Sequence, residues 1–173
     1  MRSTRISIEK DYLHFSCAHF TIFDASNREN LHGHNYHLKC ELDAHIGSDG
    51  LCFDYNLIKT ALSNLCASLD EFTLLPEQSP FLSIDHKAGG DAKSVIAHFG
   101  EEAIPFLARD IKCLPVSNIT IEELSRWLLE ELAEKIALPS LPILKLSLGV
   151  SSGEGQWALS DWSPQDSAGH NNT

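Results

Sequence analysis

The order in which hydrophobic periods follow one another most constrains how this chain can fold. Residues 6–19 are rich in aromatic and β-branched residues and contain no proline or glycine, and residues 32–46 alternate between apolar and polar side chains. Both patterns predict β-strands. An amphipathic helix is predicted next, with Asp54 as its N-cap, because apolar residues then recur at intervals of three and four. These residues are Leu57, Ile58, Ala61, Leu62, Leu65 and Leu69.

A second helix and two further strands are predicted in the last third of the chain. Thr120 and Glu123 have the spacing of a capping box, and Pro139 marks the end of the helix. Residues 141–150 and 156–162 alternate as two strands around a glycine-containing turn. The order strand, strand, helix, helix, strand, strand predicts an α+β domain with an antiparallel sheet. The apolar stripe of the second helix comprises Leu124, Trp127, Leu128, Leu132 and Ile136.

Residues 76–115 interrupt this order between the two helices. Three short strand-like segments lie there, at 80–85, 94–100 and 104–115, with a turn at 87–93. We therefore expect a β-hairpin insertion within one domain. The predicted domain spans residues 1–162, and residues 163–173 are expected to form a loose C-terminal tail.

Composition excludes several classes of partner. The formal net charge is −11, and a surface that binds nucleic acid or anionic lipid needs a basic footprint, so we expect neither partner. No run of 18 apolar residues and no apolar leader occurs, so no membrane span is expected. The five cysteines are odd in number and lack a CxxC spacing, which favours buried thiols in a reducing compartment, with the cytoplasm as the expected location.

The segment LHGHNY (31–36) raises the question of a metal site. Alternate residues of a strand share a face, so His32 and His34 point the same way, and His19 ends the preceding strand as a third candidate ligand. Most histidines are surface or hydrogen-bonded residues, and the spacing alone favours neither interpretation over the other.

A family resemblance decides between them. The segments FSCAHF (15–20), LHGHNY (31–36) and DGLCFDYNLIK (49–59) resemble, in order and spacing, the 6-pyruvoyltetrahydropterin synthase / 6-carboxytetrahydropterin synthase family, and NITIEELSRWL (118–128) is similar to its second-helix segment. The resemblance implies a tunnelling fold, in which ββααββ subunits form trimers that stack into a homohexamer. It also implies Zn²⁺ bound by His19, His32 and His34, and a small-molecule dihydropterin bound between subunits.

The resemblance also implies roles for other positions, and the chain departs from several of them. In the family, zinc holds the side-chain hydroxyls of 7,8-dihydroneopterin triphosphate, a cysteine with an aspartate and a histidine moves protons, and a late glutamate anchors the ring. Here Arg28 stands at the cysteine position, and Glu71 stands at the histidine position beside a retained Asp70. Ser152 aligns with the anchoring glutamate, and Glu154 follows two residues later. An arginine is always protonated near neutral pH, so it cannot replace the cysteine as a base.

Glu29 offers a substitute base. It precedes His32 by three residues, where some family members carry a glutamate and resemble enzymes that cleave the side chain by a retro-aldol step to give 6-hydroxymethyl-dihydropterin. This role requires that burial raise the pKa of the carboxyl towards neutrality. A solvated loop carboxylate is the equally weighted alternative. Glu71 is either a second acid–base group, a partner for Arg28 or an ordinary charged residue at a helix end, and Cys17 is either a thiol near the metal or a small core residue.

The sequence thus predicts a zinc-dependent lyase-type enzyme of pterin metabolism that transforms the side chain of 7,8-dihydroneopterin triphosphate or a close relative. The alternative is a non-catalytic or repurposed zinc-containing protein that binds pterins or purines. The product and the pathway, whether folate, a reduced pterin cofactor or a deazapurine nucleoside such as queuosine, stay open. The candidate catalytic residues are Glu29, Asp70 and Glu71, and the candidate substrate-binding residues are Thr120, Ser152 and Glu154.

Overall fold

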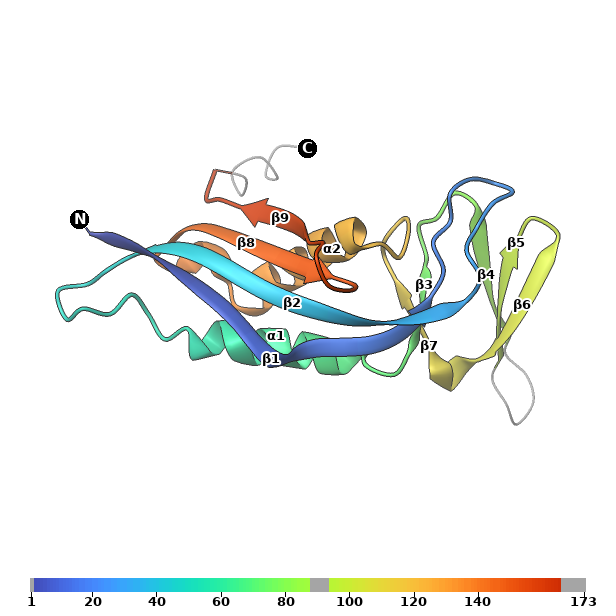
Figure 1. Cartoon of the computed structure of the whole chain (residues 1–173), viewed down its shortest axis with the longest axis horizontal. Coiled ribbons are helices and arrows are strands. Elements are labelled where there is room, and N and C mark those ends of the chain that lie inside the picture. Colours follow the sequence, from blue (N-terminus) through green and yellow to red (C-terminus); the bar gives the residue numbers. More distant parts are fainter. Residues whose placement is uncertain (1, 88–93, 166–173) are drawn as a thin grey trace.

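A six-stranded sheet with two helices on one of its faces forms the body of the protein (Figure 1). The computed structural model describes residues 2–87 and 94–165. The turn expected at 87–93, except for Lys87, and residues 166–173 of the expected tail lie outside the described residues. In chain order the elements are β1 (Ser3–His19), β2 (His32–His45), α1 (Asn56–Leu69), β3 (Thr73–Pro76), β4 (Leu82–Lys87), β5 (Ser94–Phe99), β6 (Glu102–Leu107), η1 (Ala108–Asp110), β7 (Ile111–Leu114), α2 (Ile121–Lys135), η2 (Leu138–Ser140), β8 (Ile143–Ser151) and β9 (Ala158–Trp162).

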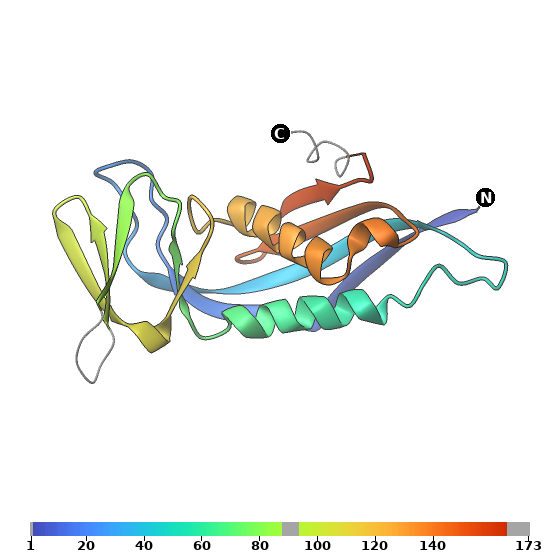
Figure 2. The ribbon, with the colours of Figure 1, turned by 180° about the vertical axis from the view of Figure 1, so that it is seen from behind.

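The main sheet has the strand order β7-β3-β1-β2-β8-β9. Helices α1 and α2 lie side by side across the same face, with α1 against β1 and α2 against β8 and β9 (Figure 2). Buried residues alternate with exposed or half-buried ones from Leu13 to His19 in β1 and from Tyr36 onwards in β2, and in β1 the alternation is interrupted by a register shift between Glu9 and His14. The predicted α+β fold with two helices over a sheet is confirmed.

The prediction of an antiparallel sheet is wrong at one edge. Strand β3 pairs in parallel with β1 through Ala18 and Thr73, and β7 pairs in parallel with β3 from Ile111 to Leu114. Strand β3, which ends where the expected insertion begins, and β7, at the end of that insertion, therefore extend the main sheet, which is mixed. The pattern of each short strand shows only that it is extended and leaves its partner open, so the sequence could not predict this pairing.

The prediction of a β-hairpin in residues 76–115 is also wrong, because three strands of this segment pair with one another, not two. Strands β4, β5 and β6 form a separate three-stranded antiparallel sheet, seen at the end of the molecule in Figure 1. This small sheet has its own hydrophobic core, in which Val95 and Phe99 pack with Phe20 and Leu75 of the main body. The third strand, β6, adds Ile104 and Phe106 to this second core.

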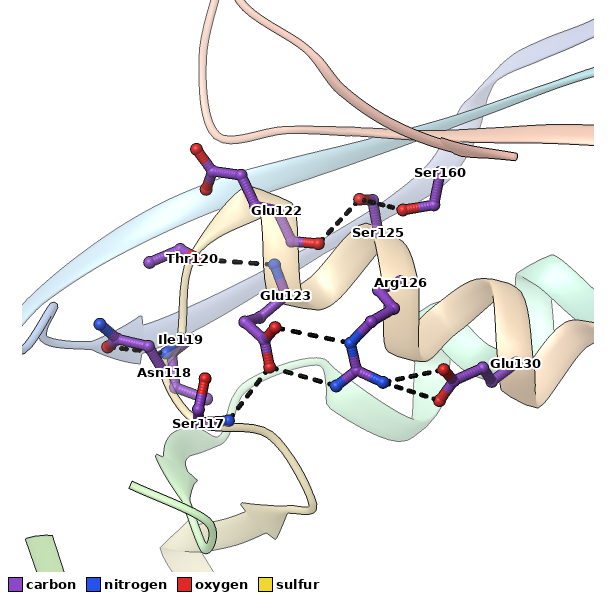
Figure 3. Close-up of polar contacts among 10 residues, drawn as sticks. All are labelled: Ser117, Asn118, Ile119, Thr120, Glu122, Glu123, Ser125, Arg126, Glu130 and Ser160. Carbon is purple, nitrogen blue, oxygen red and sulfur yellow. Dashed lines mark hydrogen bonds and ion pairs between the residues drawn. The ribbon is translucent and has the colours of Figure 1, made fainter. Parts of the chain in front are cut away.

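The predicted N-cap is correct for α2 and wrong for α1. Helix α1 begins at Asn56 after Tyr55, not after Asp54, because the Asp54 carboxylate accepts a hydrogen bond from the Asn56 N–H and forms a turn just before the helix. Thr120 is confirmed as the N-cap of α2, and its hydroxyl accepts a hydrogen bond from the Glu123 N–H (Figure 3). The Glu123 carboxylate turns instead towards the Ser117 N–H.

No helix in the described part of the chain is long and apolar enough to cross a membrane.

Candidate metal centre and adjoining pocket

The three predicted histidines meet at one end of the main sheet. His19 is the last residue of β1 and stands opposite His32, the first residue of β2, while His34 stands opposite Cys17. One ring nitrogen from each histidine lies within 4.8 Å of the others, and the Nε2 atoms of His32 and His34 are 3.0 Å apart. The antiparallel register of β1 and β2 therefore creates the cluster, with two rings from one strand and one from its neighbour.

Backbone carbonyls orient two of the three rings. His19 Nδ1 lies 3.0 Å from the carbonyl oxygen of Ile119, and His32 Nδ1 lies 2.8 Å from that of Asn30. A carbonyl oxygen only accepts, so each Nδ1 carries the proton and each Nε2 keeps its lone pair for a metal. Histidines that bind metals commonly donate their other N–H in this way.

The electrostatics of the cluster suit a cation. Burial, and then the neighbouring His32 and His34, lower the pKa of His19 to about 4, so this ring is neutral near pH 7. Metal binding requires neutral imidazoles. Three histidine nitrogens with a fourth position open to solvent or substrate form a donor set that catalytic zinc sites use, with Zn–N distances of about 2.0–2.1 Å. The His19, His32 and His34 side chains therefore fit Zn²⁺.

Tyr36 belongs to the centre and was not predicted. Its hydroxyl oxygen lies 3.0 Å from His19 Nε2, the ring nitrogen whose lone pair a metal would take, and the residue is only 1% exposed. Burial raises the pKa of this phenol well above its ordinary value, so it stays protonated. Tyr36 continues the period-two pattern of His32 and His34 along β2, and that pattern was the available signal for it.

Glu29 lies beside the histidines, and the pKa of its carboxyl is not raised towards neutrality, the condition that its role as a base was expected to need. Its Oε2 is 3.9 Å from His32 Nε2 and accepts a hydrogen bond from the Thr21 N–H over 3.0 Å. Burial raises the pKa of the Glu29 carboxyl, but the hydrogen bonds from Thr21 and the nearby His32 and His19 outweigh burial and leave this pKa below its ordinary value. The side chain is 37% exposed, so the increase in pKa caused by burial is smaller than the combined decrease caused by these partners. Glu29 is an ionised carboxylate at neutral pH.

Arg28 pairs with Glu102 of β6, which corrects the suggested pairing with Glu71. Its guanidinium donates to the Glu102 carboxylate and, over 2.8 Å, to the Glu29 carbonyl oxygen. The guanidinium also lies over the rings of Phe20 and Phe99. The arginine at the expected cysteine position therefore joins the small sheet to the loop that carries Glu29.

Asp70 acts on the backbone of β1. Its Oδ1 accepts a hydrogen bond from the Ser16 N–H over 2.8 Å, and the next residue, Glu71, donates its N–H to the Ser16 carbonyl. Between Ser16 and His19 lies Cys17, which is 5% exposed, and burial together with the charge of Asp70 raises its pKa to about 12. Cys17 is thus a buried, protonated thiol, which agrees with its interpretation as a small core residue.

A pocket of about 830 Å³ adjoins the metal centre. His34 and Cys17 line it next to the metal centre, and Glu71, Ser152 and Glu154 also contribute to its wall. The structure thus brings one predicted catalytic residue and two predicted substrate-binding residues to the same cavity as a metal-centre histidine. The loop after β8 and the segment after α1 supply part of the remaining wall, and strands β1 and β2 supply another part. These lining residues are Phe72, Thr73, Gly153, Gly155 and Trp157 from the two segments, and Ser16, Ala18, Gly33, Asn35 and His37 from the two strands.

Thr120 reaches the site only through its neighbour. Its hydroxyl is used as the N-cap of α2, as Figure 3 shows, and it is not among the residues that line the pocket. The preceding residue, Ile119, supplies the carbonyl that orients His19, and Asn118 bonds through its side chain to both backbone groups of Ile22. The start of α2 therefore fixes the position of His19 from a point 100 residues along the chain.

Comparison with known proteins identifies the family. A sequence model of the 6-pyruvoyl tetrahydropterin synthase family matches residues 7–158. This chain belongs to that family. No curated protein sequence matches it.

Solved structures of family members have the same fold. The 6-pyruvoyltetrahydropterin synthase of Plasmodium vivax is 28% identical, with a TM-score of 0.84 over 94% of this chain and 99% of that one. A variant of the same enzyme, with a catalytic glutamate replaced by alanine, gives 28% identity and a TM-score of 0.83 over the same shares of the two chains. The Plasmodium falciparum enzyme is 27% identical, with a TM-score of 0.82 over 93% of this chain and 98% of that one. The predicted family resemblance is confirmed, and the chain has the fold of a family of pterin-related lyases.

Proposed function

We propose that this protein is a zinc-dependent lyase that transforms the side chain of 7,8-dihydroneopterin triphosphate or a close relative. The observation that carries this proposal is the meeting of three imidazole side chains, His19, His32 and His34, with the Glu29 carboxylate beside them. When bound, zinc supplies a Lewis acid that lowers the pKa of substrate hydroxyls. Each of the three imidazoles contributes one ring nitrogen to it.

Glu29 is the proposed base. The pKa of its carboxyl is lowered, not raised towards neutrality as the sequence interpretation required, but the ionised carboxylate is the form that accepts a proton. The hydrogen bond from the Thr21 N–H and the contact of Arg28 with the Glu29 carbonyl oxygen hold it beside His32. The Plasmodium vivax enzyme has a catalytic glutamate, which supports the same role for a glutamate in this chain. Proximity to the ligands matters because the acidified hydroxyl must lie within hydrogen-bond reach of the base.

The proposed reaction is a retro-aldol cleavage. Glu29 takes the proton from the hydroxyl on the second side-chain carbon, and the O–H electron pair forms a carbonyl there. The bond between the first and second side-chain carbons breaks, and its electron pair is delocalised into the pterin ring. The first carbon then takes a proton, which gives 6-hydroxymethyl-dihydropterin and an aldehyde that carries the rest of the side chain.

The adjoining pocket is the proposed site of the pterin ring. Ser152 and Glu154 stand on its wall, and a carboxylate that accepts two ring N–H groups is a strong and specific anchor. Glu71, on the opposite segment, is the proposed second acid–base group. We assign Asp70 and Thr120 to positioning, since each uses its side chain on the backbone. We further propose that the protein acts as a homo-oligomer, as a trimer or a hexamer, in the cytoplasm.

Product analysis tests this proposal. Zinc-loaded protein is incubated anaerobically with 7,8-dihydroneopterin triphosphate, and the pterins are identified by mass. We expect 6-hydroxymethyl-dihydropterin from the unaltered protein and a rate at least about 100-fold lower from Glu29→Gln, because a general base typically contributes 10²–10⁴-fold. Glu101→Gln, an exposed glutamate in the turn before β6, is the matched control and should keep the full rate.

The other outcomes are informative in distinct ways. A carboxy or pyruvoyl product would reject the retro-aldol cleavage by Glu29, but it would still support a lyase that acts on this substrate. Unchanged substrate, with zinc and pterin still bound, would reject the lyase and support the non-catalytic pterin- or purine-binding alternative.

A further inference from the structure

A second group of metal-ligand side chains lies outside the pterin site, where the small sheet meets the main sheet. It consists of Glu77, just after β3, His86 in β4 and Cys113 in β7. One ligand atom from each, a carboxylate oxygen, a ring nitrogen and the thiol sulfur, lies within 4.8 Å of the others. The three residues are 9 and 27 positions apart in the sequence, so only the tertiary fold brings them together.

The strand registers direct all three side chains into the same interface. In β4 the residues that face the second hydrophobic core are Leu82 and Ile84, and His86 is next on that face. In β7 Cys113 follows Ile111 on the face towards the same core. On both strands, the residue that follows the last apolar core residue on this face is a potential metal ligand. Both ligands therefore lie at the same edge of the second hydrophobic core, which we call the rim.

Glu77 reaches the rim in the same way. Leu75 belongs to the second core, and Glu77 is two residues further on. The Glu77 N–H donates to the Leu114 carbonyl over 2.9 Å, which continues the pairing of β3 with β7 and holds Glu77 next to Cys113. Within residues 2–87 and 94–165, no hydrogen bond or ion pair engages the side chain of Glu77, His86 or Cys113.

The donor set selects a class of ion. Thiolate and imidazole ligands favour Zn²⁺ and similar transition metals, whereas Ca²⁺ and Mg²⁺ take oxygen ligands. Three protein ligands bind zinc at about 2.0–2.3 Å and leave a fourth position for water. Glu77 and His86 are exposed and Cys113 is half-buried, so an ion can enter, and the two exposed side chains can move the short distance needed to close on it.

We propose that Glu77, His86 and Cys113 form a second transition-metal site, which ties the three-stranded sheet to strands β3 and β7 of the main sheet. The ion would join three strands at a rim where the second hydrophobic core ends. Its role is structural and separate from the proposed pterin chemistry, so the two proposals stand or fall separately.

Cobalt spectroscopy tests the site directly, because the first centre has only histidine ligands. Co²⁺ bound through a thiolate gives a sulfur-to-cobalt charge-transfer band in the near ultraviolet. We expect this band in the unaltered protein at a stoichiometry of two Co²⁺ per chain, and its loss with one Co²⁺ retained in Cys113→Ser. Cys17→Ala is the critical control: it removes the thiol beside the first centre and should leave the band unchanged.

Removal of the first centre isolates the second. His32→Ala/His34→Ala should keep one Co²⁺ with the thiolate band, and Zn²⁺ should raise its melting temperature by several degrees. The same Zn²⁺ shift should disappear when His86→Gln is added and persist when His98→Gln, which alters the neighbouring strand, is added instead.

Two results would overturn the proposal. One is the absence of a thiolate band in the unaltered protein at saturating Co²⁺, which requires no variant to fold. The other is a band that is lost in Cys17→Ala and kept in Cys113→Ser, which would assign the thiolate to the first centre.

Discussion

Arg28 carries the contact between the small sheet and the loop of the proposed base, and its removal should cost substantial stability. The guanidinium lies 5.0 Å from the ring centroid of Phe20 and 5.7 Å from that of Phe99. It also donates to the Glu29 carbonyl and to the Glu102 carboxylate. Its side chain is only 17% exposed, so these interactions are partly shielded from water.

The contributions can be ranked. Each cation–π contact contributes about 0.5–1 kcal/mol at a partly exposed site, and a hydrogen bond from a charged donor contributes about 1.5–3 kcal/mol. The ion pair with Glu102, whose side chain is 56% exposed, contributes only about 0.2–1 kcal/mol. Since such terms overlap, we expect Arg28→Ala to lower the free energy of unfolding by about 3 kcal/mol, and to lower Tm by about 6–12 °C in a chain of this size.

Urea unfolding of the metal-free protein, followed by circular dichroism, measures this loss. Glu102→Gln is the matched control, because it removes the ion pair and keeps the two ring contacts and the bond to Glu29; we expect a loss below about 1 kcal/mol. Arg28→Lys should fall between the two, because lysine keeps the charge without the planar fork. If Arg28→Ala and Glu102→Gln lose the same stability, the rings and the Glu29 carbonyl contribute nothing and the reasoning is refuted.

Three further predictions follow from single contacts. His34→Ala should weaken zinc binding by more than the 10- to 100-fold that loss of an outer partner typically causes, measured by competition with a chromophoric chelator. Asp70→Ala should cost about 1–2 kcal/mol in urea unfolding by leaving the Ser16 N–H unpaired, whereas Asp70→Asn, which keeps an acceptor oxygen, should cost less. Hydrogen bonds from Arg126, and then from Ser117, lower the pKa of Glu123 in the folded state. The ionised Glu123 therefore stabilises the fold above the ordinary glutamate pKa, and this stabilisation is lost as the pH falls through the lowered pKa. Glu123→Gln should therefore be less stable than the unaltered protein by about 1 kcal/mol at pH 7, and urea unfolding should show this gap closing as the pH falls through the lowered pKa of Glu123; a gap that stays constant with pH would contradict the assignment.

The sequence by itself determined the long elements and the position of the three candidate metal-binding histidines. The aromatic and β-branched residues of 6–19, the alternation in 32–46 and the stripes of the two helices are local patterns that predict local structure. The same local rule placed His32 and His34 on one face, and a neighbouring strand that ends at His19 completed the triad. Thr120 was recognised as an N-cap for the same reason, because capping depends on residues three positions apart.

Only the tertiary structure decided what surrounds those ligands. The Ile119 carbonyl that orients His19 is 100 residues away from it, and the guanidinium of Arg28 takes Glu102 as its partner across a sheet that the sequence predicted only as a hairpin. Pairing between distant strands, as between β3 and β7, depends on the whole chain and leaves no periodic signal in either strand. The sequence also left the pKa of Glu29 open between a raised value and that of a solvated carboxylate, since the exposure of its carboxyl and the hydrogen bond from the Thr21 N–H are properties of the folded loop.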